Sequence, residues 1–203
     1  MNIVFFGDSI CTGQRVSVHS GWVVKISAEL SKKYDIVVTN SSANGRTTRQ
    51  ALEAMPYEVQ SAPPEVLIIQ FGMNDCNYWT TDNGLPRVSK KSFCANLEEI
   101  IVRGLNFGVR KIFVNTNHVT GLTQKFPYAE ITYQQSNEEY NHLIRETCES
   151  LDVVVNDIEK VFKKQHNALD FLLPDLLHLN ERGHILYFGA IYPILKGVLD
   201  ERD

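Results

Sequence analysis

The sequence has no long hydrophobic run and no block of charge of one sign. No stretch approaches the roughly 18 consecutive apolar residues that a transmembrane helix requires, so we expect no membrane insertion. Acidic residues number 24 and basic residues 20, which gives a formal net charge of −4, and the basic residues are scattered. The densest basic cluster, Lys160, Lys163 and Lys164, is typical of a solvated helix face. We therefore expect no nucleic-acid partner.

The chain also lacks a recognisable metal-binding or disulfide framework. Its four cysteines, Cys11, Cys76, Cys94 and Cys148, have spacings that match no metal-ligand pattern, and we predict that they are free thiols. The histidines show no metal-ligand spacing either. The sequence therefore predicts no metal and no cofactor.

A basic and apolar leader segment is missing as well. A secretory signal would place such a segment ahead of the fold, whereas here an apolar strand is expected to start at Asn2. We therefore expect a cytoplasmic protein. The length of 203 residues suits a single domain, 1–203, and the hydrophobic content of 43% is close to the globular average.

What the sequence does contain is a regular alternation of short apolar runs with helical patterns. Strands are predicted at 3–6, 36–39, 66–71, 111–115 and 153–155. Helices are predicted at 21–33, 47–60 with an interruption near Pro56, 90–106 with Ser89 as N-cap, 134–151, 157–165 and 180–199. This alternation is typical of an α/β protein and predicts a three-layer α/β/α sandwich with a five-stranded parallel sheet.

The last predicted helix and two long loops complete this outline. The loops 72–88 and 116–133 follow predicted strands, so they should lie at the carboxyl edge of the sheet, where such folds bind ligands. The helix is expected to leave no spare apolar stripe for a dimer, and the oligomeric state stays open. Its expected core-facing residues are Ile185, Phe188, Tyr192, Leu195 and Leu199.

Four short polar segments fall at or after the ends of these elements. They are Gly7-Asp8-Ser9, 40–48 around Gly45, 71–75 around Asn74, and 175–180 with Asp175 and His178. The Ser9 hydroxyl is a weak nucleophile until a base such as His178 takes its proton. Asp175 precedes His178 closely enough for its carboxylate to reach the far imidazole nitrogen and fix the tautomer. Taken singly, Ser9 could be a helix cap, Gly45 a turn glycine and Asn74 part of an Asx turn.

Together the four segments resemble the SGNH (GDSL-type) hydrolases, a family named for a Ser, a Gly, an Asn and a His in four separated blocks. The resemblance covers the whole chain, because all four blocks are present in order, and the Gly-X-Ser-X-Gly elbow of ordinary α/β-hydrolases is absent. It implies a flavodoxin-like SGNH hydrolase fold with a catalytic triad of Ser9, Asp175 and His178. It also implies an oxyanion hole formed by the backbone N–H groups of Ser9 and Gly45 and the side-chain amide of Asn74.

Residues that would contact the substrate are less clearly marked, and the candidates are Asp8, Arg46, Trp79 and His118. Asp8 and Asp75 are interpreted mainly as acids that hydrogen-bond the loops. Arg46 could attract an anionic substrate or pair with a neighbouring acid. The loops carry side chains suited either to a sugar or acyl chain or to packing on the body, namely Tyr78, Trp79, Asp82, Arg87, Phe126, Tyr128 and Tyr133.

The sequence thus predicts a serine esterase that hydrolyses a small or carbohydrate-linked carboxylic ester, like an O-deacetylase, through an acyl-enzyme on Ser9. One alternative is an acyltransferase that passes the same acyl group to a sugar hydroxyl. A lysophospholipase or thioesterase is another, although the sequence shows no uninterrupted apolar groove for a long chain. A non-catalytic binding module is a third, and it would predict a broken triad, whereas all parts are present here.

Overall fold

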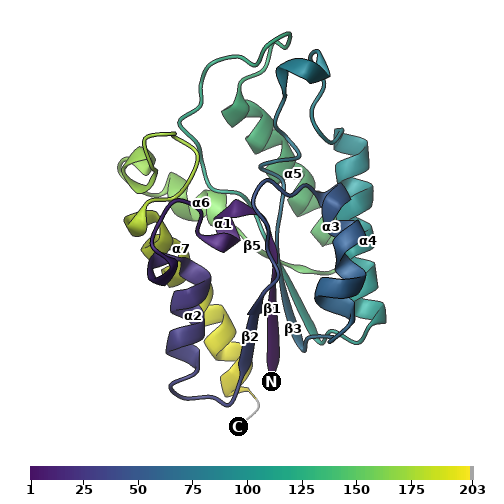
Figure 1. Cartoon of the computed structure of the whole chain (residues 1–203), viewed down its shortest axis with the longest axis vertical. Coiled ribbons are helices and arrows are strands. Elements are labelled where there is room, and N and C mark those ends of the chain that lie inside the picture. Colours follow the sequence, from purple (N-terminus) through teal and green to yellow (C-terminus); the bar gives the residue numbers. More distant parts are fainter. Residues whose placement is uncertain (202–203) are drawn as a thin grey trace.

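The computed structural model describes residues 1–201, which form a sheet between two layers of helices (Figure 1). The strands are β1 (Asn2–Gly7), β2 (Val37–Asn40), β3 (Val66–Gln70), β4 (Lys111–Asn115) and β5 (Val154–Asn156). They pair in parallel in the order β2-β1-β3-β4-β5. The predicted α/β architecture with a five-stranded parallel sheet is therefore confirmed.

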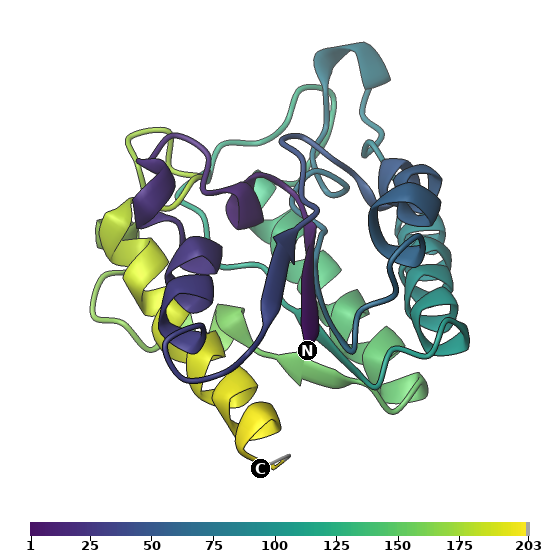
Figure 2. The same ribbon diagram turned by 60° about the horizontal axis from the view of Figure 1, so that its bottom comes forward.

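The central strands are apolar on both faces because helices cover both sides of the sheet (Figure 2). Ile3 and Phe5 of β1 face one layer, whereas Val4 and Phe6 face the other. The first layer contains α2 (Trp22–Leu30), α6 (Ile158–Lys163) and α7 (Glu181–Asp200). The second contains α3 (Thr48–Met55), α4 (Lys90–Asn106) and α5 (Tyr133–Ser150).

Capping side chains set the starts of the long helices. The Ser89 hydroxyl accepts a hydrogen bond from the Ser92 N–H at 3.3 Å at the start of α4, as the sequence predicts. The predicted helix 47–60 is α3 followed by a π-helical turn, η2 (Pro56–Gln60). The change falls at Pro56 because proline has no N–H to continue the α-helical ladder.

The predicted core face of α7 is confirmed at Leu195 and Leu199 and is wrong by one position in the first part of the helix. Ile185 is 56% exposed, and Phe188 and Tyr192 are only half-buried. The residues that α7 buries in the core are His184, Tyr187, Ile191, Leu195 and Leu199.

Two polar groups on the buried stripe of α7 find partners inside the protein. The His184 Nδ1 accepts a hydrogen bond from the Trp22 N–H at 3.4 Å. The Tyr187 hydroxyl donates to Gln70 Oε1 at the end of β3. Because both groups are satisfied, these residues can occupy the core without the penalty of an unpaired polar atom.

Substitutions in α7 should separate the two faces by their effect on stability. We expect Ile191→Ala to lower the free energy of unfolding by about 2–5 kcal/mol, because it removes a fully buried side chain and leaves a cavity. Ile185→Ala, on the exposed face, should change it by less than about 0.5 kcal/mol. Urea denaturation measures both values, and equal losses would contradict the observed orientation of the helix.

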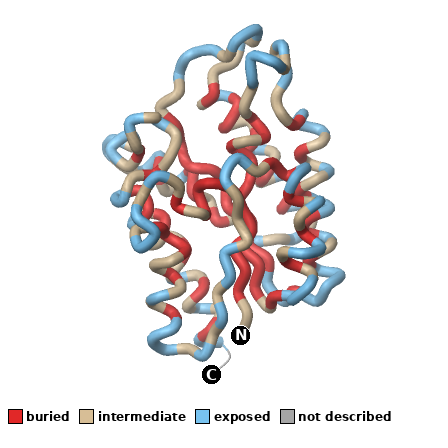
Figure 3. The backbone as a smooth tube through the Cα atoms, in the orientation of Figure 1, coloured by how far each residue is buried: buried red, intermediate tan, exposed pale blue. Residues whose placement is uncertain are grey.

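The buried residues concentrate in the sheet and continue past its carboxyl edge (Figure 3). The two long loops that follow β3 and β4 rise above this edge, at the top of Figure 1. The four cysteines are free thiols, as predicted. Within residues 1–201, no helix has the combined length and apolar character required to cross a membrane.

Candidate active site

Ser9 lies where β1 ends and a single helical turn, α1 (Ser9–Thr12), begins. Asp8 caps this turn, and its Oδ1 accepts a hydrogen bond from the Ile10 N–H at 3.0 Å. The cap fixes the direction in which the chain leaves the strand. The Ser9 hydroxyl is thereby presented at the carboxyl edge of the sheet, where the residue is 7% exposed.

The predicted triad residues are joined in one hydrogen-bonded chain. His178 Nε2 lies 3.2 Å from Ser9 Oγ, and His178 Nδ1 lies 2.8 Å from Asp175 Oδ2. Asp175 Oδ1 also accepts hydrogen bonds from the backbone N–H groups of Leu177 and His178, at 3.0 and 2.9 Å. An ionised carboxylate can only accept, so Nδ1 carries the imidazole proton and Nε2 presents its lone pair to Ser9.

The environment of Asp175 keeps its carboxyl group ionised. Burial acts to raise the pKa of Asp175, but the hydrogen bonds from the backbone and side chain of His178 outweigh burial and hold the pKa below its ordinary value. Arg15 Nη1 lies 3.2 Å from Asp175 Oδ2 and adds a cation that the sequence analysis did not identify. Asp175 is therefore a carboxylate at neutral pH, as an orienting acid must be.

The loop that carries Asp175 and His178 is fixed by bonds to the segment after β4. Leu176 has a φ of 58°, a backbone conformation that non-glycine residues rarely adopt. Its carbonyl accepts a hydrogen bond from the Gly121 N–H at 2.8 Å. The next carbonyl, that of Leu177, is bound by His118 Nε2 at 2.8 Å. Two consecutive carbonyls are thus held directly before His178.

His118 is part of this support and not of the cavity wall. It is fully buried, and burial lowers its pKa to about 4, so it is neutral at physiological pH. A buried ring has no surface to offer a substrate, which corrects the expectation that His118 lines the pocket.

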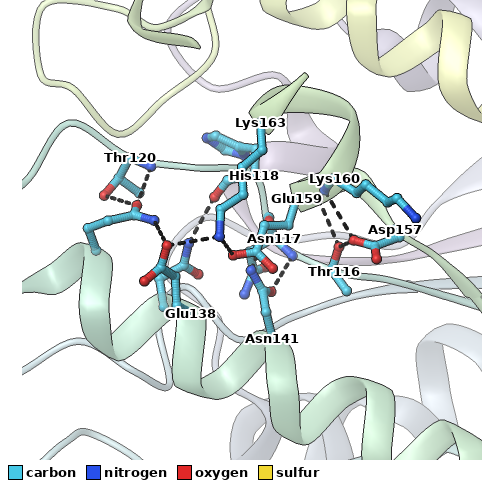
Figure 4. Close-up of polar contacts among 12 residues, drawn as sticks. Thr116, Asn117, His118, Thr120, Glu138, Asn141, Asp157, Glu159, Lys160 and Lys163 are labelled. Carbon is cyan, nitrogen blue, oxygen red and sulfur yellow. Dashed lines mark hydrogen bonds and ion pairs between the residues drawn. The ribbon is translucent and has the colours of Figure 1, made fainter. Parts of the chain in front are cut away.

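Side chains of α5 and the side chain of Asp157, the N-cap residue of α6, hold the segment that carries His118 (Figure 4). Asn141 brackets Asn117, accepting from its N–H at 2.7 Å and donating to its carbonyl at 3.0 Å. The Thr120 N–H donates to Gln134 at 2.6 Å. At the start of the segment the Thr116 hydroxyl donates to Asp157 at 3.2 Å. The segment therefore stays rigid outside regular secondary structure.

A cavity of about 300 Å³ lies beside Ser9, and both residues expected to complete the oxyanion hole line it. Gly45 has a φ of +75°, in the region that favours glycine. Asn74 follows β3 and faces the same cavity. The residues that line it are Ser9, Gln14, Asn44, Gly45, Met73, Asn74, Tyr133, Leu177 and His178. The structure thus brings together the four segments identified in the sequence.

Asp8 and Asp75 are buried acids that hydrogen-bond the loops. Asp8 Oδ2 accepts a hydrogen bond from Asn74 Nδ2 at 3.4 Å, and Asp75 Oδ1 accepts from the N–H and hydroxyl of Thr48 at 2.9 and 2.5 Å. Burial raises the pKa of Asp8 to about 7 and that of Asp75 to about 6. Because Asp8 is fully buried, the expectation that it contacts the substrate is corrected.

Arg46 and Trp79 are also occupied by protein partners. Both guanidinium ends of Arg46 bind Glu58, at 2.6 and 2.7 Å, so the alternative in which Arg46 pairs with an acid is the one observed. Trp79 is 50% exposed, and the guanidinium of Arg87 lies over its ring at 4.1 Å from the centroid. Neither Arg46 nor Trp79 lines the cavity beside Ser9.

A second cavity of about 540 Å³ adjoins the first, because Tyr133 and Leu177 line both. The rings of Tyr78 and Phe126, from the two long loops, stack there at a centroid distance of 4.6 Å. The remaining lining residues are Asn77, Gly121, Leu122, Thr123, Gln124 and Leu176. This partly apolar space is built by three segments that lie far apart in the sequence, and Asn77, Thr123 and Gln124 interrupt its apolar lining.

Comparisons with known proteins agree on one family and one fold. The sequence model of the GDSL-like Lipase/Acylhydrolase family matches residues 5–186. GDSL esterase/lipase CPRD49 of Arabidopsis thaliana is 24% identical over 204 residues, which cover 96% of this chain and 78% of that protein.

Solved structures show the same architecture over almost the whole chain. A lipase/acylhydrolase from Enterococcus faecalis superposes with a TM-score of 0.80 at 25% identity, covering 97% of this chain and 95% of that one. The acetyl xylan esterase AlAXEase gives a TM-score of 0.78 at 18% identity, covering 96% and 99%.

Proposed function

The chain belongs to the GDSL-like lipase/acylhydrolase family and is an ester-hydrolysing enzyme, and we propose that it cleaves a small or carbohydrate-linked carboxylic ester through an acyl-enzyme on Ser9. The observation that carries the proposal is the unbroken chain from Ser9 Oγ through His178 to Asp175, with separations of 3.2 and 2.8 Å. A hydroxyl hydrogen-bonded to an oriented imidazole is an activated nucleophile. No cofactor is needed for this chemistry.

In the proposed reaction Ser9 Oγ attacks the acyl carbon while His178 Nε2 takes the hydroxyl proton. The carbonyl oxygen becomes an oxyanion, which would receive hydrogen bonds from the N–H groups of Ser9 and Gly45 and the amide of Asn74. His178 then gives the proton to the leaving alcohol oxygen as the ester bond breaks. A water molecule then attacks the acyl carbon while His178 Nε2 takes one of its protons. His178 returns that proton to Ser9 Oγ as the bond between Oγ and the acyl carbon breaks and the acid is released.

The cavity beside Ser9 supports a small acyl group. Its volume of about 300 Å³ lies at the low end of small-molecule sites, and the nucleophile and the oxyanion donors occupy part of its wall. Gln14, Asn44 and Asn74 place polar groups around the cavity, which suits an alcohol with several hydroxyl groups. One structural neighbour is an acetyl xylan esterase, whose substrate contains such an alcohol. At 18% identity this likeness shows only that the fold is shared.

The adjoining cavity supports a second candidate function, hydrolysis of an ester or thioester with a longer apolar chain. Its stacked Tyr78 and Phe126 rings, together with Leu122 and Leu176, could cover several methylene groups. A chain entering from Ser9 would pass between Tyr133 and Leu177, which line both cavities.

A panel of p-nitrophenyl esters from acetyl to dodecanoyl, together with O-acetylated xylo-oligosaccharides, tests the two candidates. We expect kcat/KM to be highest for acetyl to butyryl esters and for the acetylated sugar. A maximum at octanoyl or longer would instead favour the second candidate. Failure to hydrolyse any ester would contradict both. Product analysis with a sugar acceptor present separates hydrolysis from acyl transfer.

A further inference from the structure

One side chain, that of Arg87, connects the two residues predicted to complete the oxyanion hole. Both terminal nitrogens of its guanidinium donate to the Gly45 carbonyl, each at 3.2 Å. The Nη1 also donates to Asn74 Oδ1 at 3.3 Å. Gly45 and Asn74 come from loops after different strands, and Arg87 bridges them with one rigid, planar group.

We propose that Arg87 is a positioning residue for the oxyanion hole, which it holds and polarises by binding Gly45 and Asn74 together. The proposal rests on the proposed function, because it assigns Arg87 to the same reaction. Arg87 does not line the cavity beside Ser9, so it acts through these two residues and not by contact with the substrate.

The bond to Asn74 decides how its amide is oriented. A guanidinium can only donate, so the atom that faces Arg87 must be the amide oxygen. The amide nitrogen is consequently turned toward Asp8, to which it donates at 3.4 Å, and one of its two hydrogens is left for the cavity. A cation bound at the amide oxygen draws electron density from the N–H bonds, which strengthens them as donors to a developing oxyanion.

The bond to Gly45 restrains a residue that has no side chain to limit its backbone conformation. Glycine has the widest choice of backbone conformations, and Gly45 has a φ of +75° with open space where a Cβ would lie. The hydrogen bond from Arg87 fixes the position of the Gly45 carbonyl. The Gly45 N–H, which would meet the oxyanion, lies on the other side of the same Cα and is thereby restrained. Pre-arranged donors need no reorganisation at the moment of reaction, which is the source of their catalytic effect.

Arg87 is itself held firmly enough to perform this role. Its backbone N–H donates to the Asn77 carbonyl at 2.8 Å, and the next N–H, that of Val88, donates to the Asp75 carbonyl at 3.1 Å. These bonds close the loop after β3 at its base. The ring of Trp79 supports the guanidinium at 4.1 Å, a favourable cation–π contact, and this gives Trp79 a role that needs no substrate.

The test compares Arg87→Met and Arg87→Lys with the wild-type enzyme on p-nitrophenyl acetate. We expect Arg87→Met to lower kcat by about 10- to 100-fold, somewhat less than the loss of a donor itself, while KM stays within about twofold. Arg87→Lys should recover part of the loss, because its ammonium carries the charge but cannot bridge both oxygens in the same way. Arg103→Met, on the surface of α4 where Arg103 pairs with Glu99, is the matched control and should match wild type.

A second measurement separates positioning from a general structural effect. Phenylboronic acid forms a tetrahedral adduct with the nucleophile and places an oxygen where the oxyanion would lie. Its inhibition constant should therefore rise in Arg87→Met by about the factor by which kcat falls. Trp79→Leu keeps the charge of Arg87 but removes the ring that supports its guanidinium. It should lower kcat and raise the inhibition constant, each by about three- to tenfold.

Wild-type kcat and boronate affinity in Arg87→Met would overturn the inference. A loss of kcat with unchanged boronate affinity would overturn it as well, since the oxyanion site would then be intact. Absence of ester hydrolysis in the wild-type enzyme would instead contradict the proposed function, so the two failures can be distinguished.

Discussion

Replacing Ser9 with alanine is expected to lower kcat for p-nitrophenyl acetate by about 10⁵- to 10⁶-fold, because the members of a triad act as a unit. The change removes the oxygen that lies 3.2 Å from His178 Nε2 and leaves no atom to form the acyl-enzyme. The backbone N–H of residue 9 stays in place, so residual turnover above the uncatalysed rate would come from the remaining oxyanion donors and from binding. Initial rates measured with a large excess of the variant enzyme determine this residual activity.

The Ser9→Ala variant should fold like the wild type. The cap of α1 comes from Asp8 and not from Ser9, so the turn after β1 keeps its hydrogen bond to Ile10. The melting temperature should accordingly stay within a few degrees of the wild-type value. Ser17→Ala is a matched control, because Ser17 is exposed and its side chain makes no capping bond. Wild-type rates in a folded Ser9→Ala variant would remove Ser9 as the nucleophile.

Covalent labelling gives an independent view of the same residue. Paraoxon should transfer a diethylphosphoryl group to Ser9 Oγ with release of p-nitrophenol, and peptide mapping should find the added mass on the peptide that contains Ser9. Ser9→Ala should take up no label. Labelling at Cys11 or another side chain would contradict the assignment.

The fold was predictable because its signals are local. Each strand is a short apolar run, and the start of α4 is marked by a capping serine that the structure confirms, Ser89. The four site segments follow the same logic, since three of them follow strands of the parallel sheet and the fourth directly precedes α7. Their meeting at one edge follows from topology and requires no knowledge of side-chain contacts.

The features that the sequence did not predict depend on contacts between distant segments. The core face of α7 was misplaced because Ile185 and Ile191 belong to neighbouring stripes, and the correct stripe contains His184 and Tyr187, whose polar atoms find partners on other elements. Hydrophobic periodicity alone favours the stripe without a histidine.

The surroundings of the site were hidden for the same reason. The second cavity, which adjoins the one beside Ser9, is built from three separate segments, and no single one of them is apolar throughout. His118 was expected at the pocket because it follows β4, yet its ring turns into the body and binds Leu177. Arg87 was visible in the sequence as one more polar loop residue, and only its position identifies Gly45 and Asn74 as its partners.

Asp175→Asn is expected to have a smaller effect than Ser9→Ala, lowering kcat by about 10³- to 10⁴-fold at neutral pH. In the wild type the ionised carboxylate accepts the Nδ1 proton of His178 at 2.8 Å, which leaves Nε2 free to take the proton of Ser9. An asparagine amide can present its N–H group to Nδ1, which stabilises the other tautomer. Nε2 would then carry a proton and could no longer act as a base toward Ser9.

The pH dependence of kcat and the melting temperature should show that the effect of Asp175→Asn is electronic and that the loop keeps its structure. The asparagine Oδ1 can still accept from the N–H groups of Leu177 and His178, so the loop should keep its conformation and the melting temperature should change little. Because hydrogen bonds hold the pKa of Asp175 below its ordinary value, the wild-type carboxylate stays charged throughout neutral pH, and the deficit of the variant should persist there.

Asp152→Asn is the control, since Asp152 is exposed and its positive φ of 54° suits asparagine equally well. Near wild-type activity in a folded Asp175→Asn enzyme would mean that Ser9 and His178 work as a dyad and that Asp175 only shapes the loop.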